Sequence, residues 1–180
     1  MIIAQLQSGD KEIFGIIIDR YEGKLVGYAT RLIQNHDMAE DAVQEAFMKS
    51  YRDIHSFDIR RKFSSWIYRI VHNEAISQVR KVSRNDSLED VFEIPSGIDV
   101  ASEISKKLDI KSINREIDLV MKKLSLKYRE VVLLRFYEDK TYDEISEILH
   151  LPVNTVGTYI SRAKKEFKKN LQNVNIEEYL

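Results

Sequence analysis

Apolar residues along the chain recur at alternating spacings of three and four, which is the pattern of an α-helix with one buried face. The clearest such series lies in the C-terminal part of the chain and comprises Val153, Val156, Ile160, Ala163 and Phe167. No stretch of useful length alternates apolar and polar residues, as a half-buried strand would. The pattern therefore predicts an all-α fold.

The periodicity falls into two blocks, which we interpret as two small helical domains. The first block, residues 1–81, is predicted to hold helices at 1–21, 24–35, 38–54 and 62–81. The second block, residues 113–172, is predicted to hold helices at 113–124, 127–137, 142–149 and 153–171. Asp37, with Glu40 three residues later, predicts a capping box at the start of the third helix.

The stretch between the blocks, residues 82–112, differs in composition. It contains Pro95 and Gly97 and carries four basic against seven acidic side chains. Segments rich in Ser, Asp, Gly and Pro favour loops over helices. We therefore expect an acidic flexible linker here, with a short helix near 99–111, and a frayed tail at 173–180.

Composition argues against several function classes. Cysteine is absent, so the chain has neither a disulfide framework nor a thiolate metal site. The four histidines form no HxxxH or HExxH pair, which disfavours a zinc enzyme. Neighbouring carboxylates such as Glu40 and Asp41 have no companion constellation of His, Ser or Cys. We therefore expect no catalytic residue, no metal and no cofactor.

The sequence also predicts where the protein resides. The N-terminal residues lack the basic start, apolar core and small-residue cleavage site of a secretory signal. No apolar run approaches the roughly 20 residues that a membrane span needs. We expect a soluble, cytoplasmic protein without membrane insertion.

The formal net charge is only −1, but the basic residues are unevenly distributed. Residues 60–81 hold six cations against the single anion Glu74, and residues 154–170 hold five cations against Glu166. Because Lys and Arg neutralise phosphates, both stretches are candidate nucleic-acid surfaces.

Residues 141–165 have the pattern of a helix-turn-helix. Thr141 and Glu144 predict a capping box for a short first helix, and Pro152 suits the first turn of the helix that follows. The apolar series described above would bury one face of this second helix. Its other face presents Asn154, Thr158, Ser161, Arg162, Lys165 and Lys169. Such side chains suit base edges and phosphates along the major groove.

Three stretches, in this order, resemble the extracytoplasmic-function (ECF) sigma factors of the sigma-70 family. They are residues 39–51 (AEDAVQEAFMKSY), residues 63–76 (FSSWIYRIVHNEAI), and residues 124–136 (LSLKYREVVLLRF) continuing through the helix-turn-helix. The resemblance covers about residues 9–171. It implies a non-enzymatic subunit that binds core RNA polymerase and directs promoter-specific transcription initiation, in response to stress.

The resemblance also implies a division of labour. The first domain would bind the polymerase clamp and the −10 promoter element, and the second would bind the polymerase flap and the −35 element. An anti-sigma factor is a further partner that the family implies. Docking on the clamp is assigned by resemblance to Asp41, Gln44, Glu45 and Met48.

For the −10 element, Lys62, Arg69 and Asn73 share one face of the predicted helix 62–81, as does Arg80. Cations and an amide on one face suit the phosphates and base edges of a melted strand. With the resemblance, the expected −10 contacts are Arg60, Arg61, Lys62, Phe63, Arg69 and Asn73. Trp66 is either a stacking platform for a base or a core residue beside Ile67 and Ile70.

For the −35 element, the resemblance gives the expected contacts Asn154, Thr155, Thr158, Tyr159, Ser161, Arg162 and Lys165. The sequence departs from the family pattern at three positions. His150 stands where the turn often has Gly, and Gly157 and Tyr159 stand where many members have Lys and Arg. These departures affect the −35 sequence that is read and the affinity.

Two other functions fit part of the sequence. A dimeric helix-turn-helix activator or repressor that acts without core polymerase would explain residues 113–172, but leaves the two motifs of the first block unexplained. A helical adaptor would bind only protein, without contacting DNA.

Overall fold

The computed structural model describes residues 2–10, 12–85 and 117–172. All regular structure within these residues is helical, which confirms the all-α prediction. Residues 86–112 of the predicted acidic linker, with its short helix, and the tail 173–180 lie outside the described residues.

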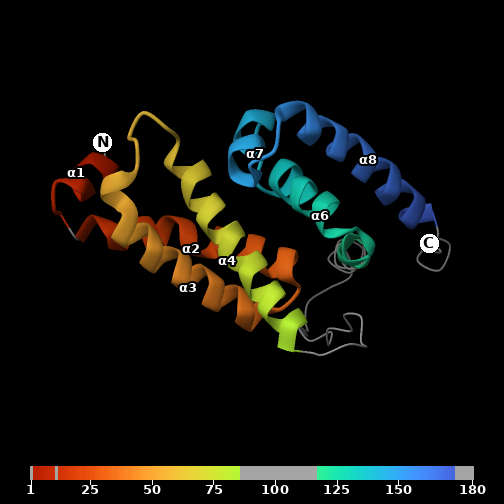
Figure 1. Ribbon diagram of the computed structural model, residues 1–180, viewed down its shortest axis with the longest axis horizontal. Helices are drawn as coiled ribbons and strands as arrows, with labels where there is room; N and C mark the ends of the chain where they lie inside the picture. Colours follow the sequence, from red (N-terminus) through yellow and green to blue (C-terminus); the bar gives the residue numbers. More distant parts are fainter. Residues whose placement is uncertain (1, 11, 86–116, 173–180) are drawn as a thin grey trace, which may run out of the picture.

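The first unit is built on three long helices that lie side by side (Figure 1). Its elements are α1 (Ile2–Gln7), α2 (Glu12–Ile33), α3 (His36–Asp53), η1 (Ile54–Ser56) and α4 (Phe63–Asn85). Leu25 and Ala29 of α2, Val43 of α3, and Ile67 and Val71 of α4 are among the residues fully buried between them. The apolar period of each helix thus faces a common core.

Three predicted boundaries in this unit are wrong. The first predicted helix is interrupted after α1, where Gly9 has a φ of 107°. Helix α2 then begins at Glu12, whose backbone N–H donates to Asp10 Oδ1 at 3.2 Å. The predicted end of a helix near Gly23 is absent. Helix α2 continues through this glycine, because Leu25 and Tyr28 extend its buried apolar face. Helix α4 runs to Asn85, four residues into the predicted linker.

The predicted capping box at the start of α3 is also wrong. The N-cap is Asn35, whose side-chain oxygen accepts a hydrogen bond from Met38 N at 3.0 Å. Asn35 has the extended backbone that a cap requires, whereas Asp37 already lies in the first helical turn. There its negative charge is favourable next to the N-terminal end of the helix dipole.

The second unit contains the helix-turn-helix. Residues 117–123 are helical, followed by α6 (Leu126–Val132), the π-helical turn η2 (Leu133–Tyr137), α7 (Tyr142–Leu149) and α8 (Val153–Gln172). The capping box of α7 is confirmed: Thr141 Oγ1 accepts from Glu144 N, and Glu144 Oε2 accepts from Thr141 N at 2.8 Å. His150 ends α7 in the left-handed conformation, with a φ of 53°.

The two units pack against each other. Helix α7 lies against the N-terminal half of α4, and α6 lies against α2 (Figure 1). Buried side chains of both units form one continuous apolar cluster. This packing brings α7 beside the loop at residues 57–62.

Candidate nucleic-acid interfaces

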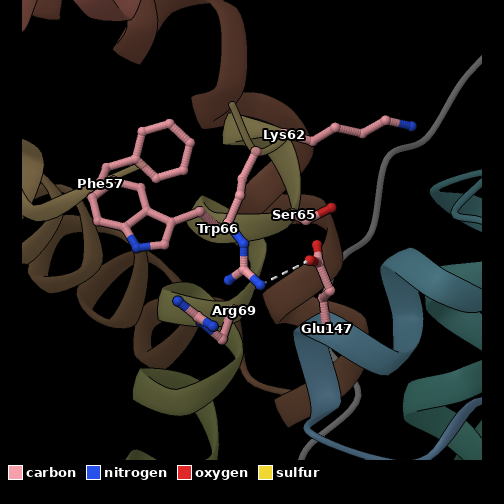
Figure 2. A pocket seen from close by; sticks show the side chains of 7 residues that line it. Phe57, Lys62, Ser65, Trp66, Arg69 and Glu147 are labelled. Carbon is pink, nitrogen blue, oxygen red and sulfur yellow. Dashed lines mark ion pairs between the residues drawn. The ribbon is translucent and has the colours of Figure 1, made fainter. Parts of the chain in front are cut away.

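A small pocket lies where the loop 57–62 enters α4 (Figure 2). It is lined by Phe57, Arg61, Lys62, Ser65, Trp66, Arg69 and, from the other unit, Glu147. Three of the residues expected at the −10 element, Arg61, Lys62 and Arg69, are therefore brought together at one site. Figure 2 shows the Phe57 and Trp66 rings on one side of the pocket and Glu147 entering from α7 on the other.

Aromatic rings form one wall of this pocket. The Trp66 ring lies 4.9 Å from Phe57 and 5.6 Å from Phe63, centroid to centroid, and Phe63 also contacts Tyr21 at 5.7 Å. Phe63 is half-buried in this aromatic cluster and is not one of the residues that line the pocket, so its expected −10 contact stays a prediction. Trp66 packs in the cluster and also lines the pocket, and its role as a stacking platform for a base stays a prediction.

Ser65 is a pocket residue that the sequence reasoning missed. Its side chain is buried, and its hydroxyl has no hydrogen-bond partner among the described residues. A buried polar atom is rarely left unsatisfied, so this hydroxyl is suited to pair with a bound group. Its position three residues after Lys62 and four before Arg69 was a usable signal, since such residues share a helix face.

The cations around the loop are already paired. Arg60 donates from Nε and Nη2 to the Asp58 carboxylate, each at 2.9 Å, and lowers the pKa of that carboxyl to about 2. Arg60 therefore faces its own loop and lies outside the pocket. Lys62 Nζ is 3.1 Å from Glu144, and Arg61 Nη2 is 3.6 Å from Glu147, both on α7.

Farther along α4, Asn73 and Arg80 are exposed but do not line the pocket. The predicted −10 face is thus divided between the pocket at the start of α4 and an open stretch beyond it.

The expected clamp-binding residues lie on one exposed side of α3. Asp41, Gln44 and Met48 are exposed, and 62% of Met48 is open to solvent. Glu45 is half-buried and lies 3.6 Å from Lys49, whose ammonium also contacts Glu74 of α4 at 2.8 Å. Glu45 therefore contacts side chains of its own unit, whereas Asp41, Gln44 and Met48 face solvent.

The same side of α3 carries Tyr51, which the sequence reasoning missed. It is 38% exposed, and its ring contacts Phe14 at 4.8 Å. Tyr51 follows Met48 by three residues, so both lie on the same side of the helix, and this spacing was visible in the sequence.

A groove along α8 gathers most of the predicted −35 residues. It is lined by Tyr142, Val153, Asn154, Gly157, Thr158, Ser161, Arg162 and Lys165. Five of the seven expected residues are present. Thr155 is half-buried outside the groove, and Tyr159 packs edge-on against Tyr128 at 5.8 Å beside the core. Tyr159 therefore packs within its own unit and is not one of the groove residues, so its expected −35 contact stays a prediction.

Tyr142 and Gly157 belong to the groove together. A Cβ on Gly157 would lie 3.6 Å from the ring of Tyr142, in ordinary van der Waals contact, so the ring borders this position directly. Tyr142 thus lies on the side of α8 where many family members carry a cation. Sequence spacing could not find it, because it belongs to a different helix.

Within the described residues, no group of three or more His, Cys, Asp or Glu side chains could hold a metal ion. Over the same residues, none of the helices is both long and apolar enough to cross a membrane.

Comparison with known proteins identifies the family of this chain. The model of Sigma-70 region 2 matches residues 17–85, and that of Sigma-70, region 4 matches residues 114–167. The ECF RNA polymerase sigma factor SigW of Bacillus subtilis (strain 168) is 35% identical over 179 residues, which are 96% of each chain. This chain belongs to the ECF RNA polymerase sigma factors.

Further relatives agree. The ECF RNA polymerase sigma-E factor of Haemophilus influenzae is 30% identical over 178 residues, 95% of this chain and 94% of the relative. The sigma factor RpoE from Bartonella quintana, solved with the anti-sigma factor NepR, has a TM-score of 0.73 at 27% identity, covering 90% of this chain and 98% of that chain.

Membership of the ECF sigma factors confirms the family prediction and makes the protein a DNA-binding regulator, not a classical enzyme. The pocket, apart from Glu147, lies within the region 2 match, and the α8 groove lies within the region 4 match.

Proposed function

We propose that this ECF sigma factor binds core RNA polymerase and directs promoter-specific initiation through two DNA sites, one in each unit. The observation that carries this assignment is the presence on one chain of a cation-lined pocket in region 2 and a polar groove along α8 in region 4. A lone helix-turn-helix regulator would need only the second site.

At the −10 element, the pocket of α4 suits an unpaired strand. Lys62 and Arg69 neutralise phosphates, the ring of Trp66 offers a stacking surface, and the free hydroxyl of Ser65 pairs with a base edge. A base must leave the duplex before its edges are accessible to such a pocket. Asn73 extends this surface along α4.

At the −35 element, α8 lies in the major groove. Asn154, Ser161 and Arg162 line the protein groove along α8, and their donors and acceptors contact base edges of the DNA. Lys165 contacts the backbone at the end of the site. The ring of Tyr142 adds an apolar surface that suits a thymine methyl group.

Protein partners bind elsewhere. The exposed side of α3, with Asp41, Gln44, Met48 and Tyr51, docks on the polymerase clamp, where Met and Tyr are typical of interface centres. The region 4 unit binds the flap. Because a structural relative was solved with an anti-sigma factor, we assign this chain a similar partner and a stress-responsive role. Its similarity to ECF RNA polymerase sigma factors supports a cytoplasmic location, where RNA polymerase acts.

Each DNA site is small, so polymerase is needed to combine them. Holding both sites on one scaffold makes the second contact intramolecular, and the joint affinity then exceeds either contact alone. The energy for melting comes from capture of unstacked bases and from polymerase, without covalent chemistry in this chain.

Run-off transcription tests the assignment. The purified chain is added to core RNA polymerase of Bacillus subtilis and to a promoter library, and transcripts are mapped to shared upstream elements. We expect Arg162→Ala to weaken use of the −35 part, and Arg69→Ala use of the −10 part, by about tenfold each. The control Lys123→Ala, an exposed cation outside both sites, leaves transcription unchanged.

The opposite result is equally clear. Failure to bind core polymerase, together with tight binding of palindromic DNA by the chain alone as a dimer, would assign the protein to the helix-turn-helix activators and repressors.

A further inference from the structure

Helix α1 packs against the segment that leads into the loop 57–62. It contacts η1 and lies at the same end of the first unit as this loop (Figure 1). Its Leu6 is buried in an apolar cluster that includes Ile54 of η1. The rings of Phe63 and Trp66 pack against the same cluster. The short helix is therefore part of the structure that supports the −10 pocket.

One side chain of α1 also holds the backbone at the start of the loop. Gln7 Nε2 donates to Ile54 O at 2.7 Å and to Phe57 O at 2.9 Å. An amide nitrogen carries two hydrogens, so each carbonyl can receive its own. Ile54 O also accepts from Phe57 N, which closes the single turn of η1. Gln7 thus bridges the two ends of this turn.

The rest of the loop is held by its own contacts. Asp58 Oδ1 accepts from Arg60 N at 3.0 Å, and Asp58 O accepts from Arg61 N at 2.9 Å. At the far end, Lys62 leads directly into α4. Because its inner turn and its exit are fixed in this way, the position of the loop depends on its entry at Phe57.

This entry lies where the chain passes from the core to the surface. Ile54 and Phe57 are 2% and 6% exposed, whereas Ile59, at the tip of the loop, is 57% exposed. Gln7 itself is half-buried. Its two bonds therefore anchor the last buried stretch before the loop enters solvent, and a side chain supported by such contacts is held close to one geometry.

Helical periodicity could not show this contact, because Gln7 is 47 and 50 positions away from its two acceptors. The Sigma-70 region 2 match begins at residue 17, so α1 precedes it. Gln7 also does not line the pocket. Any effect it has on bound DNA must therefore pass through the loop.

Resting on the −10 role proposed above for the pocket, we propose that Gln7 is a positioning residue for the −10 strand. By holding the carbonyl of Phe57, it fixes where Arg61 and Lys62 stand relative to Trp66. Without this bond the chain folds and binds polymerase, but the loop takes up several positions and discriminates less between −10 sequences. A displacement of about 1 Å is enough to weaken such a site.

The test is transcription by the full chain with core RNA polymerase of Bacillus subtilis. One promoter from the run-off selection is compared with a derivative altered in the −10 element and another altered in the −35 element. Transcription from the intact promoter divided by that from each derivative gives a −10 ratio and a −35 ratio. These two ratios report how strictly each element is read.

We expect Gln7→Met to lower the −10 ratio about fivefold and to leave the −35 ratio unchanged, because Met keeps the side-chain length but has no donor. Gln7→Lys keeps donors that can reach the carbonyls and should restore most of the −10 ratio. Gln7→Ser is a second variant, which admits water to both carbonyls and so avoids leaving them unpaired. It should lower the −10 ratio like Gln7→Met.

Gln5 provides the matched controls. It is exposed on the same helix, so Gln5→Met and Gln5→Lys make the same chemical changes without touching the loop. Both are expected to give the ratios of the wild type. Thermal unfolding and binding to core polymerase, measured for every variant, establish that each one is folded.

The outcomes separate the role of Gln7 from that of the pocket. If Arg69→Ala lowers the −10 ratio and Gln7→Met does not, the positioning role is wrong and the pocket keeps its function. If neither variant changes the −10 ratio, the −10 assignment of the pocket fails, and the role of Gln7 fails with it.

A purely structural role for Gln7 gives a different result. Gln7→Met would then lower both ratios, Gln7→Lys would be as poor as Gln7→Met, or neither the Met nor the Ser variant would fold. Each of these results overturns the positioning role.

Discussion

At the scale of single residues, His150 shows how a turn is tolerated at a measurable cost. It ends α7 with φ 53° and ψ 41°, in the left-handed region where a Cβ is unfavourable. Its backbone N–H still donates to Ser146 O, so α7 ends in a left-handed C-cap, a position that glycine usually occupies. The tertiary structure thus imposes this conformation on a residue that does not favour it.

We expect His150→Gly to stabilise the protein by about 0.5–1 kcal/mol. Glycine relieves the backbone strain of the folded state. Its greater conformational entropy in the unfolded chain reduces the resulting increase in the free energy of unfolding. Thermal unfolding of the variant measures the change. The control His150→Ala keeps the Cβ, so an equal gain from both substitutions would show that the imidazole, and not the backbone, was unfavourable.

A buried histidine, His72, faces a half-buried carboxylate, Glu130, between the units. His72 Nε2 of α4 lies 3.7 Å from a Glu130 oxygen of α6, and the Tyr28 hydroxyl lies 3.0 Å from His72 Nδ1. Burial lowers the pKa of His72 to about 4, assisted by the charge of Arg80, and burial raises the pKa of Glu130 to about 7. Between these values both side chains are neutral in the folded protein.

The pH dependence of these two residues is opposite. Below its ordinary pKa of 6.5, His72 takes a proton more readily in the unfolded chain, so stability falls as the pH falls toward 4. Glu130 is protonated in the folded state between 4.5 and about 7, so stability rises as the pH falls through that window. The two effects offset each other between pH 4.5 and 6.5.

We therefore expect Glu130→Gln to make the protein more sensitive to acid. With only His72 left, unfolding by urea should show stability falling from pH 6.5 toward 4 by up to about 3 kcal/mol more than in the wild type. Combining it with His72→Gln should flatten this difference. A Glu130→Gln variant with the pH profile of the wild type would rule out the offset.

At the scale of helices, two N-caps in the same unit differ in what their side chains do. Thr141 forms both hydrogen bonds of a capping box at α7, whereas Ser125 is the N-cap of α6 without a side-chain cap bond. The residue type alone does not separate them, since both favour caps. What separates them is whether Glu or Gln stands three residues later, as Glu144 does after Thr141.

We expect Thr141→Ala to destabilise the protein by about 1 kcal/mol, and Ser125→Ala to change stability by less than about 0.5 kcal/mol. Urea unfolding of the two variants under the same conditions measures both. Because α7 supports α8, Thr141→Ala should also weaken binding of −35 duplex DNA. Equal losses for the two variants would mean that the capping box contributes nothing of its own.

At the scale of the whole molecule, Arg129 joins the two units. Its guanidinium donates to the carbonyls of Met121, Lys122 and Leu124 within its own unit, and to Leu32 O at the end of α2. Arginine can serve four acceptors at once because its donors form a rigid, planar fork. One side chain thus satisfies helix ends on both sides of the interface.

We expect Arg129→Lys to lower stability by about 2 kcal/mol, because an ammonium cannot reach all four carbonyls. Urea unfolding measures the change. Arg135→Lys is the control, since Arg135 donates to one carbonyl, Lys140 O, and otherwise lies over the Tyr142 ring, both in its own unit. We expect that control to lose less than about 1 kcal/mol. Equal losses in the two variants would mean that the four-carbonyl contact of Arg129 contributes nothing of its own.

Local features of this protein were readable from the sequence alone. The helical period, the Thr141–Glu144 capping box and the turn at His150 depend on residues one helical turn apart, and their spacing is visible in the chain. Even here a local competition misled the prediction at α3, because Asn35 and Asp37 could both cap and only the backbone conformation decided between them. Five of the seven residues predicted for the −35 element line one groove along α8, because a single helical face carries them.

Only the tertiary structure decided what lies between the elements. Lys62 and Glu144 are 82 positions apart, and no period relates them, so the contact of α7 with the residues around the pocket was not visible in the sequence. The same holds for Tyr142 in the α8 groove and for Phe63 and Tyr159, which packing turned toward neighbouring aromatic rings. Sequence periodicity determines which face of a helix is buried, whereas the partner of that face is set by how whole helices pack.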